Sequence, residues 1–281
     1  MKGTPWWAGR AARLVVLVIG ALMFVFPFYY MLAGSLQEEP NADISGAFPN
    51  PANLTFSNYT GINEAISLGR TLLNSAIFAG GVVAATLVFG LLAGYALAVL
   101  EWRGRDSLFA IVLLVQIIPF QLLMIPLYVL IVRTYGLADS YLGMILPFAI
   151  SPVAVFVFRQ FFRTIPRELF DAARIDGASE LRVLRYIAAP LVKPAILTVV
   201  LLTFIGPWNE FLWPFLITKQ ADMQPLAVAL ANYISNLAGR AANPFGAILA
   251  GACVLAAPPV ILFALFQRRF TAAELGSVVK G

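Results

Sequence analysis

The sequence has no histidine and a single cysteine, Cys253. One cysteine excludes a disulfide within the chain. The lack of histidine removes the commonest general base and the commonest metal ligand of proteins. The phosphate-binding pattern G-x-x-x-x-G-K-[ST] does not occur either, so any ATP hydrolysis linked to this chain belongs to a partner.

Charge is also scarce. Charged residues make up 12% of the chain and hydrophobic residues 60%, whereas an ordinary soluble domain carries about 25% charged residues. The mean hydropathy is +0.85. Apolar runs of about 18 residues or more recur, and each is long enough to cross a hydrocarbon core of about 30 Å. This composition predicts an all-α protein that crosses a membrane several times.

Hydropathy predicts six transmembrane helices within one transmembrane domain, residues 1–281. The predicted spans are residues 14–34, 71–100, 108–132, 141–158, 195–217 and 245–266. We expect the first span to be retained, because it is longer than the apolar part of a signal peptide and no small-residue cleavage site follows it. The main connections are loop 35–70, loop 159–194 and the tail, residues 267–281.

Lysine and arginine are unevenly distributed among these connections. Of the 19 such residues, only Arg70, Arg133, Lys219 and Arg240 lie outside the N-terminal arm, the connection between the second and third spans, loop 159–194 and the tail. The positive-inside rule places the connections richer in these residues in the cytoplasm. Both termini and loop 159–194 are therefore predicted to be cytoplasmic, and loop 35–70 extracytoplasmic. The net charge of +5 is explained by topology, and we expect no nucleic-acid partner.

Loop 159–194 has the pattern of two short helices joined by a glycine. Pro166 suits a first helical turn, and Glu168 follows where the helix dipole favours an acid. Leu169, Ala172, Ala173 and Asp176 then recur at helical spacing until Gly177 interrupts them. Ser179 can cap a second helix, in which Leu181, Leu184 and Ala188 share a face, and Pro190 and Pro194 end the segment. On these grounds alone the loop could be an amphipathic connector at the membrane surface.

The spacing in this loop resembles the "EAA" motif of permease subunits of binding-protein-dependent bacterial ABC importers. The family pattern is E-A-A, three residues, Gly, nine residues, then I-x-L-P. This chain has Asp171-Ala172-Ala173, then Gly177, then Ile187-Ala188-Ala189-Pro190 at the same spacing. It departs from the pattern at Asp171, where the family has Glu, and at Ala189, where the family has Leu. The "DGAS" of residues 176–179 is also typical of the family.

Two further stretches resemble the carbohydrate-uptake subgroup of that family. "GPWNEFLWPFLI", residues 206–217, is similar to the fifth span of permeases of the maltose-transporter type. "FTAAELGSVVKG", residues 270–281, resembles the subgroup's "T-A-G-x-V-K-G" ending with a short insertion. The resemblance covers nearly the whole chain and implies a type I ABC importer permease fold, with the chain as the second permease.

The resemblance also implies partners and a coupling site. In the family this loop carries a coupling helix that docks in a groove of an ATP-hydrolysing subunit. Carried over by position, the contact residues here are Asp171, Ala172, Ala173, Asp176 and Gly177. The implied partners are a second related permease, two ATP-binding subunits that hold ATP and magnesium, an extracytoplasmic substrate-binding protein and a sugar substrate. The chain itself would have no cofactor and no catalytic residue, and would lie in a bacterial inner membrane.

Polar residues within the predicted spans are candidates for the transport pathway. Glu210 lies about 22 Å into the fifth span at 1.5 Å per residue, beside Trp208 and Asn209. These three side chains suit a sugar pathway, because sugars are held by hydrogen bonds and aromatic faces. They equally suit a polar cluster at the interface between two permeases. Gln116 and Gln121 of the third span are further pathway candidates.

Three rival functions are weighed on the residues. A secondary transporter needs ion-coupling charges near the membrane midplane, but Glu210 is the only convincing acid in a span and is off-centre. An intramembrane enzyme needs a catalytic constellation, which the predicted spans lack. A non-catalytic membrane scaffold is opposed by the proline-rich spans and the EAA spacing. Only the ABC importer requires a bound ATPase.

Overall fold

The computed structural model describes residues 6–237 and 244–278. Helices make up most of these residues, which contain no β-strand and only an isolated bridge between Gln37 and Leu54. The all-α prediction is therefore confirmed for the described part of the chain. The chain forms two compact units, Met1–Leu68 with Leu230–Gly281, and Gly69–Ala229. Each unit contributes candidate spans. That these spans form a single transmembrane domain stays a prediction.

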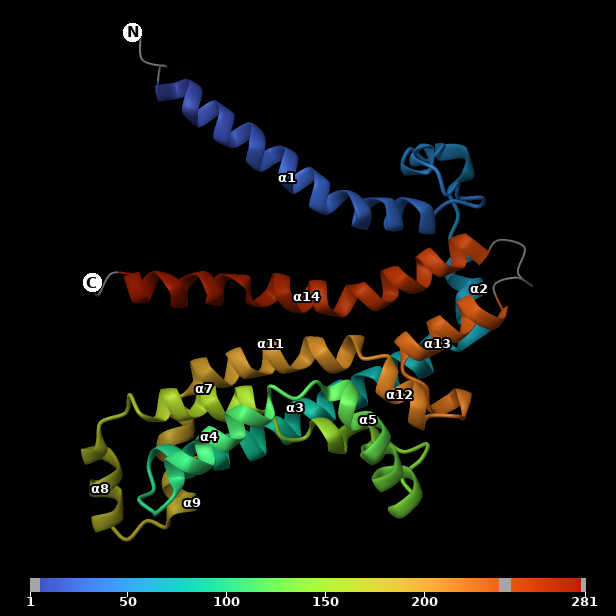
Figure 1. The fold of residues 1–281 in the computed structure, drawn as a ribbon. Helices are drawn as coiled ribbons and strands as arrows, with labels where there is room; N and C mark the ends of the chain where they lie inside the picture. Colours follow the sequence, from blue (N-terminus) through green and yellow to red (C-terminus); the bar gives the residue numbers. More distant parts are fainter. Residues whose placement is uncertain (1–5, 238–243, 279–281) are drawn as a thin grey trace. The chain divides into compact units, whose positions relative to one another are not determined.

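The first unit contains the first and the last helix of the chain. Its elements are α1 (Trp6–Ser35), η1 (Ile44–Ala47), η2 (Pro51–Asn53), α2 (Ser57–Ile66), η7 (Tyr233–Leu237) and α14 (Pro244–Val278). Helices α1 and α14 run in opposite directions (Figure 1) and meet where Gly34 faces Leu249. Buried Ile62 of α2 packs with Tyr233 and Ala250 in the core of this unit. The predicted tail, residues 267–281, begins within α14, and residues 279–281 lie outside the described part.

Loop 35–70 contains η1, η2 and α2 and is held by buried side-chain hydrogen bonds. The Asn58 side chain in α2 donates hydrogen bonds to the backbone oxygens of Ser35 and Gln37. The Gln37 amide in turn donates to the oxygens of Ala33 and Gly46. These buried side-chain amides replace regular secondary structure, because buried backbone groups need hydrogen-bond partners.

The second unit contains the remaining elements. They are α3 (Leu68–Ala98), α4 (Arg105–Val115), α5 (Phe120–Tyr128), η3 (Val129–Thr134), α6 (Tyr141–Ile145), η4 (Leu146–Phe148), α7 (Pro152–Phe162), α8 (Arg167–Ile175), α9 (Glu180–Val183), η5 (Leu184–Ala188), α10 (Ala189–Leu191), α11 (Lys193–Asn209), α12 (Leu212–Ile217), η6 (Ala221–Met223) and α13 (Leu226–Asn232), whose last residues belong to the first unit. Figure 1 shows α8 and α9 at the same end of this unit as the start of α4.

Three described helices are long and apolar enough to cross a membrane: Arg13–Ser35, Leu68–Ala98 and Pro244–Gln267. Three bent helix pairs pass the same test together. They are Arg105–Val115 with Phe120–Thr134, bent by 92°, Tyr141–Phe148 with Pro152–Phe162, bent by 54°, and Glu180–Leu191 with Lys193–Asn209, bent by 82°. The structure thus supports between three and six spans, and the predicted third and fourth spans are broken helices. The 82° bend lies before the predicted fifth span, residues 195–217, which is interrupted instead between α11 and α12.

The breaks have local causes. In the third predicted span, the N–H groups of Gln116, Ile117 and Ile118 bond to oxygens three residues earlier, which tightens the last turn of α4. Pro119 follows, and a proline disfavours helical geometry at the residue before it. In the fourth, the Ser151 hydroxyl accepts from the N–H of Ala154 and starts a new helix. Hydropathy averages over such residues and therefore misses the breaks.

Helices α3 and α7 approach closely because α3 carries two glycines. A β-carbon on Gly94 would lie 2.6 Å from the β-carbon of Phe158, and one on Gly90 would lie 3.2 Å from that of Ala154. Small residues four apart let membrane helices pack backbone against backbone. Fully buried Phe158 lies in the core cluster that this contact forms with Tyr95. This core supports the end of the unit at which α8 lies.

Candidate functional site

Helix α8 is the first of the two helices predicted in loop 159–194. It follows Pro166, has Glu168 in its first turn and Arg174 in its last turn, as the helix dipole favours. Gly177 adopts a left-handed φ of +80°. The N–H of Gly177 bonds to the oxygen of Arg174, and that of Ala178 to the oxygen of Ala173. This is the Schellman arrangement of a helix end, and it confirms the predicted glycine bend.

The described surface of α8 differs from the predicted contact face in one respect. Ala172 is exposed, as are Asp171, Asp176 and Gly177. Ala173 is only 7% exposed, because it packs in the core cluster with Phe170. The two adjacent alanines therefore point to opposite environments, and only Ala172 is available for close approach by another chain.

An apolar residue outside the predicted contact set is the most exposed large hydrophobic side chain of α8. Ile175 is 86% exposed, and Leu169 on the same helix is 46% exposed. A large apolar side chain in water at a helix surface costs free energy that a partner can recover. Sequence periodicity missed Ile175, because it lies outside the i, i+3, i+4, i+7 series that starts at Leu169.

The second predicted helix is present, with two departures. It starts after Ser179, but the Ser179 side chain forms no capping hydrogen bond. The sequence predicts that Leu181, Leu184 and Ala188 share a face. In the structure Leu184 and Ala188 are buried, but Leu181 is 66% exposed, with Val183 buried in its place. The segment Leu184–Ala188 is a π-helix, whose wider turn shifts the buried face relative to α-helical spacing. The predicted end of the segment at Pro190 and Pro194 agrees with the 82° bend before Lys193.

A polar network crosses the glycine bend. Arg174 Nε donates to Glu180 Oε1 at 2.8 Å, and Arg174 Nη1 donates to Asp171 Oδ1 at 3.0 Å. The Tyr95 hydroxyl of α3 donates to Glu180 Oε2 at 2.6 Å. The hydrogen bond from Arg174 lowers the pKa of Glu180, and the carboxylate in turn raises the pKa of Arg174. Both groups are therefore charged at neutral pH.

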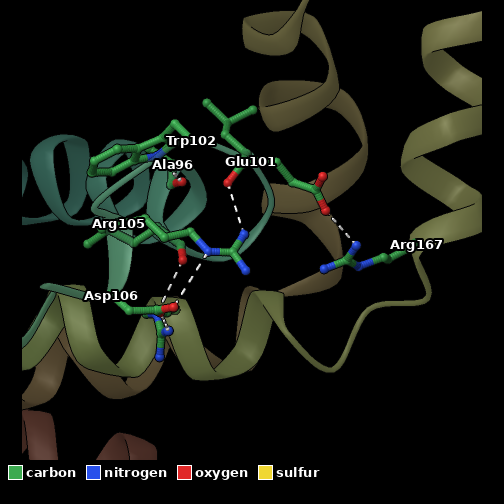
Figure 2. A network of polar contacts seen from close by, with 9 residues as sticks. Ala96, Glu101, Trp102, Arg105, Asp106 and Arg167 are labelled. Atoms are coloured by element: carbon green, nitrogen blue, oxygen red, sulfur yellow. Dashed lines mark hydrogen bonds and ion pairs between the residues drawn. The ribbon is translucent and has the colours of Figure 1, made fainter. Parts of the chain in front are cut away.

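A second contact joins α8 to the segment after α3. Arg167 Nη1, at the first residue of α8, lies 2.8 Å from Glu101 Oε1 (Figure 2). The same segment is held by Trp102, whose indole N–H donates to the oxygen of Ala96, and by Arg105, which donates to the oxygen of Leu100. A polar cavity of about 1000 Å³ opens between these residues and α8.

Arg159 of α7 is a buried cation at the edge of this cavity. It is 7% exposed. Its Nε donates to the oxygen of Leu97, and its Nη2 lies 2.8 Å from Asp106 Oδ1. Its guanidinium also lies 4.0 Å from the centroid of the Phe109 ring. The charge pattern counts Arg159 among the topology-setting residues, but the structure gives it a packing role that joins α3, α4 and α7.

The three polar residues predicted at the end of the fifth span do not form one site. Glu210 Oε1 accepts hydrogen bonds from the N–H groups of Leu212 and Trp213, and so caps the start of α12. Trp208 is buried and stacks on a neighbouring phenylalanine, and the Asn209 amide donates to a backbone oxygen one turn earlier. The carboxylate that looked available for a pathway is thus used in a local helix cap.

The two glutamines of the third predicted span lie in different surroundings. Gln116 lies at the break after α4 and lines a cavity of about 670 Å³, together with Ser151 of the α7 cap and Thr203 of α11. Gln121 is exposed on α5 and does not line this cavity. The remaining lining residues are apolar. No group of three or more potential metal ligands gathers in the part of the chain that the structure describes.

Comparison with known proteins agrees with these features. The chain is 34% identical over 277 residues to the arabinooligosaccharides transport system permease protein AraQ of Bacillus subtilis, covering 97% of this chain and 96% of that protein. It is 32% identical to the sn-glycerol-3-phosphate transport system permease protein UgpE of Yersinia pseudotuberculosis, covering 91% of this chain and 92% of the relative.

A similar solved structure is that of a bacterial ABC transporter involved in the import of the acidic polysaccharide alginate. It matches with a TM-score of 0.82 and 25% identity, covering 94% of this chain and 99% of that chain. Residues 65–272 match the model of one family, described as the inner membrane component of binding-protein-dependent transport systems. This chain belongs to that family of inner membrane transport components.

Proposed function

We propose that this chain is the permease subunit that forms half of the translocation pathway of an ATP-driven importer of carbohydrates. Loop 159–194 couples it to a separate ATPase, with α8 as the coupling helix. The observation that carries this proposal is the geometry of α8 in a chain of this family. The helix presents Asp171, Ala172 and Ile175 to solvent and ends in a left-handed glycine, Gly177.

The exposed surface of α8 suits insertion into a groove. Ala172 leaves room for a close backbone, while Ile175 and Leu169 provide apolar surface on either side. Burying an exposed isoleucine side chain contributes about 1.5–3 kcal/mol. Asp171 and Asp176 lie at the edge of this surface and can accept hydrogen bonds from basic groups of the partner. Ala173 supports the helix from the core side.

The proposed assembly follows the family. It contains a second related permease, two ATP-binding subunits that hold ATP and magnesium, and an extracytoplasmic substrate-binding protein. In this arrangement the two bent pairs that begin at Arg105 and Tyr141 are one span each, and segment 195–217, which follows the cytoplasmic helices of loop 159–194, is another. With the three continuous helices this makes six spans, and both termini face the cytoplasm of a bacterium. This chain contributes no catalytic residue and no bound cofactor. ATP hydrolysis is the task of the partner subunits.

The substrate we favour is a neutral sugar. The 670 Å³ cavity beside Gln116 lies at the breaks of two predicted spans, where broken helices commonly line a pathway. Its described lining includes no charged side chain, and its polar groups are an amide and hydroxyls. Such groups bind sugar hydroxyls, whereas a phosphate needs cationic or multiple N–H donors. Arabino-oligosaccharides therefore fit this cavity better than sn-glycerol-3-phosphate.

The test is a matched pair of substitutions at Gly177. Gly177→Pro forces φ to about −65° and removes the N–H that bonds to Arg174. Gly177→Asn preserves the bend, because asparagine tolerates left-handed geometry. We expect the proline variant to lose about tenfold or more of the ATPase activity that co-purifies with the tagged chain, since roughly 1.4 kcal/mol at the bend is a factor of ten. The asparagine variant should stay close to wild type.

Uptake into proteoliposomes then tests the substrate. The probes are arabinotriose and sn-glycerol-3-phosphate, each presented with the binding protein of the system. We expect ATP-dependent uptake of arabinotriose that Gly177→Pro abolishes. Normal co-purification and hydrolysis in the proline variant would make loop 159–194 a membrane-surface connector and refute its coupling role.

A further inference from the structure

Tyr95 is a buried side chain of α3 that contacts both α8 and the first residue of α9. It is 3% exposed, and its ring packs edge to face against Phe170 of α8 and Phe162 of α7, at centroid distances of 6.1 and 5.7 Å. Its hydroxyl donates to Glu180 Oε2 at 2.6 Å. A hydrogen bond to a carboxylate is about twice as strong as one between neutral groups. Helix α3 is thus fastened to the loop, although Tyr95 and Phe170 are 75 positions apart in the sequence.

Glu180 connects Tyr95 to the exposed surface of α8. Its other oxygen accepts from Arg174, whose second nitrogen donates to Asp171. Asp171 is 62% exposed at its side chain and is one of the predicted contacts to the ATPase. Four side chains therefore form a continuous polar path from the surface of α8 to a buried residue of α3.

The contact between Arg167 and Glu101 joins the other end of α8 to the segment after α3. Both side chains are about 70% exposed. Exposed ion pairs contribute little because water screens them. Of the two polar links, the one through Glu180 is therefore the stronger.

We propose that Glu180 and Tyr95 are positioning residues that transmit movement of α8 directly to α3, the helix of the second predicted span. The proposal rests on the proposed function, because it assumes that an ATPase moves α8. Chain connectivity links α8 only to the fourth and fifth spans. The path through Glu180 adds the second span, so that the helix packed on α7 at Gly94 moves with the loop.

The experiment follows an ATP-driven change at a distant cysteine. Cys253→Ser removes the native cysteine, and Gln116→Cys places a new one at the 670 Å³ cavity. The complete complex is purified through a tag on this chain. The rate at which a maleimide modifies the new cysteine is measured without nucleotide and with ATP and vanadate. We expect ATP and vanadate to change this rate in the parent complex.

Two small substitutions then break the path. Tyr95→Phe removes only the hydroxyl and keeps the ring contacts, and Glu180→Gln removes the charge that holds Arg174. Each should reduce the ATP-dependent change in rate by roughly tenfold or more, which corresponds to the loss of one charge-assisted hydrogen bond. The double variant should lose no more than Glu180→Gln alone, because both substitutions interrupt the same path. Complex yield and basal ATP hydrolysis should be unchanged.

Matched controls lie in the same loop. Tyr186→Phe removes a hydroxyl from an exposed tyrosine. Glu168→Gln neutralises an exposed acid of α8 that forms no ion pair with the described residues. Both should behave like the parent. If Tyr95→Phe and Glu180→Gln also match the parent while ATP still changes the rate, the transmission path is wrong and the coupling role stands. If no ATPase co-purifies, or ATP changes nothing in the parent, the proposed function itself fails.

Discussion

At the scale of single residues, the sequence predicts only the side of the membrane on which a charged side chain lies. The structure shows in addition which of these side chains are buried or hydrogen-bonded. Arg159 is the clearest case. Its guanidinium donates to a backbone oxygen and to Asp106 and stacks on Phe109 at 4.0 Å. Lysine has a single compact ammonium group and reproduces neither the fork geometry nor the stacking.

Arg159→Lys should therefore destabilise the purified protein although it keeps the charge. We expect a loss of about 1–3 kcal/mol, the cost of hydrogen bonds to a charged group. The measurement is the midpoint of thermal unfolding in detergent, followed by tryptophan fluorescence. Arg182→Lys is the control, because Arg182 is exposed and makes no ion pair within the described residues. Equal midpoints for the two variants would show that the Arg159 contacts contribute little.

The residues also show what sequence reasoning can and cannot reach. The bend at Gly177 was predictable, because a helix end depends on a few adjacent residues. The bond between Tyr95 and Glu180 was not, because the two residues are 85 positions apart and no local pattern links them. Glu210 was recognised as unusual in a span, but its use as a cap depends on the break before Leu212, which hydropathy does not reveal. Ala172 and Ala173 are the same type of residue, but the fold exposes Ala172 and buries Ala173.

At the scale of helices, the packing of α3 on α7 depends on missing side chains. A β-carbon on Gly94 would lie 2.6 Å from the β-carbon of Phe158 and 3.1 Å from the backbone nitrogen of Arg159, so the helices would have to separate. Overpacking of this kind costs about 1–3 kcal/mol. Gly80 is in the same helix, and a β-carbon there would meet nothing within 4 Å.

We therefore expect Gly94→Ala and Gly80→Ala to have opposite effects on stability. Gly94→Ala should lower the thermal midpoint, whereas Gly80→Ala should leave it unchanged or raise it, because alanine favours a helix over glycine by up to about 1 kcal/mol. Limited proteolysis of loop 159–194 gives a second measure, since α8 packs on the same core. A stabilising Gly94→Ala would mean that α3 and α7 are not in close contact in the membrane.

At the scale of the whole molecule, the open question is how many times the chain crosses the bilayer. Six hydrophobic regions were predictable because spans need about 20 apolar residues each. Whether the 92° pair, Arg105–Val115 with Phe120–Thr134, crosses or turns back is a separate matter. Hydropathy is the same in either case. The charge pattern favours crossing, because with the N-terminus inside, a pair that turned back would place loop 159–194, the connection richest in lysine and arginine, outside the cytoplasm.

Single cysteines in the Cys253→Ser chain distinguish these topologies. Phe48→Cys, Tyr135→Cys and Ile175→Cys replace exposed side chains in loop 35–70, after η3 and in α8. In intact spheroplasts a membrane-impermeant maleimide should label the first two, because six spans place both outside. Ile175→Cys should react only after the membrane is opened, because positive-inside topology places loop 159–194 in the cytoplasm. If Tyr135→Cys, like Ile175→Cys, reacts only after the membrane is opened, the 92° pair is re-entrant. The basic residues, not the number of apolar segments, then determine the side on which α8 lies.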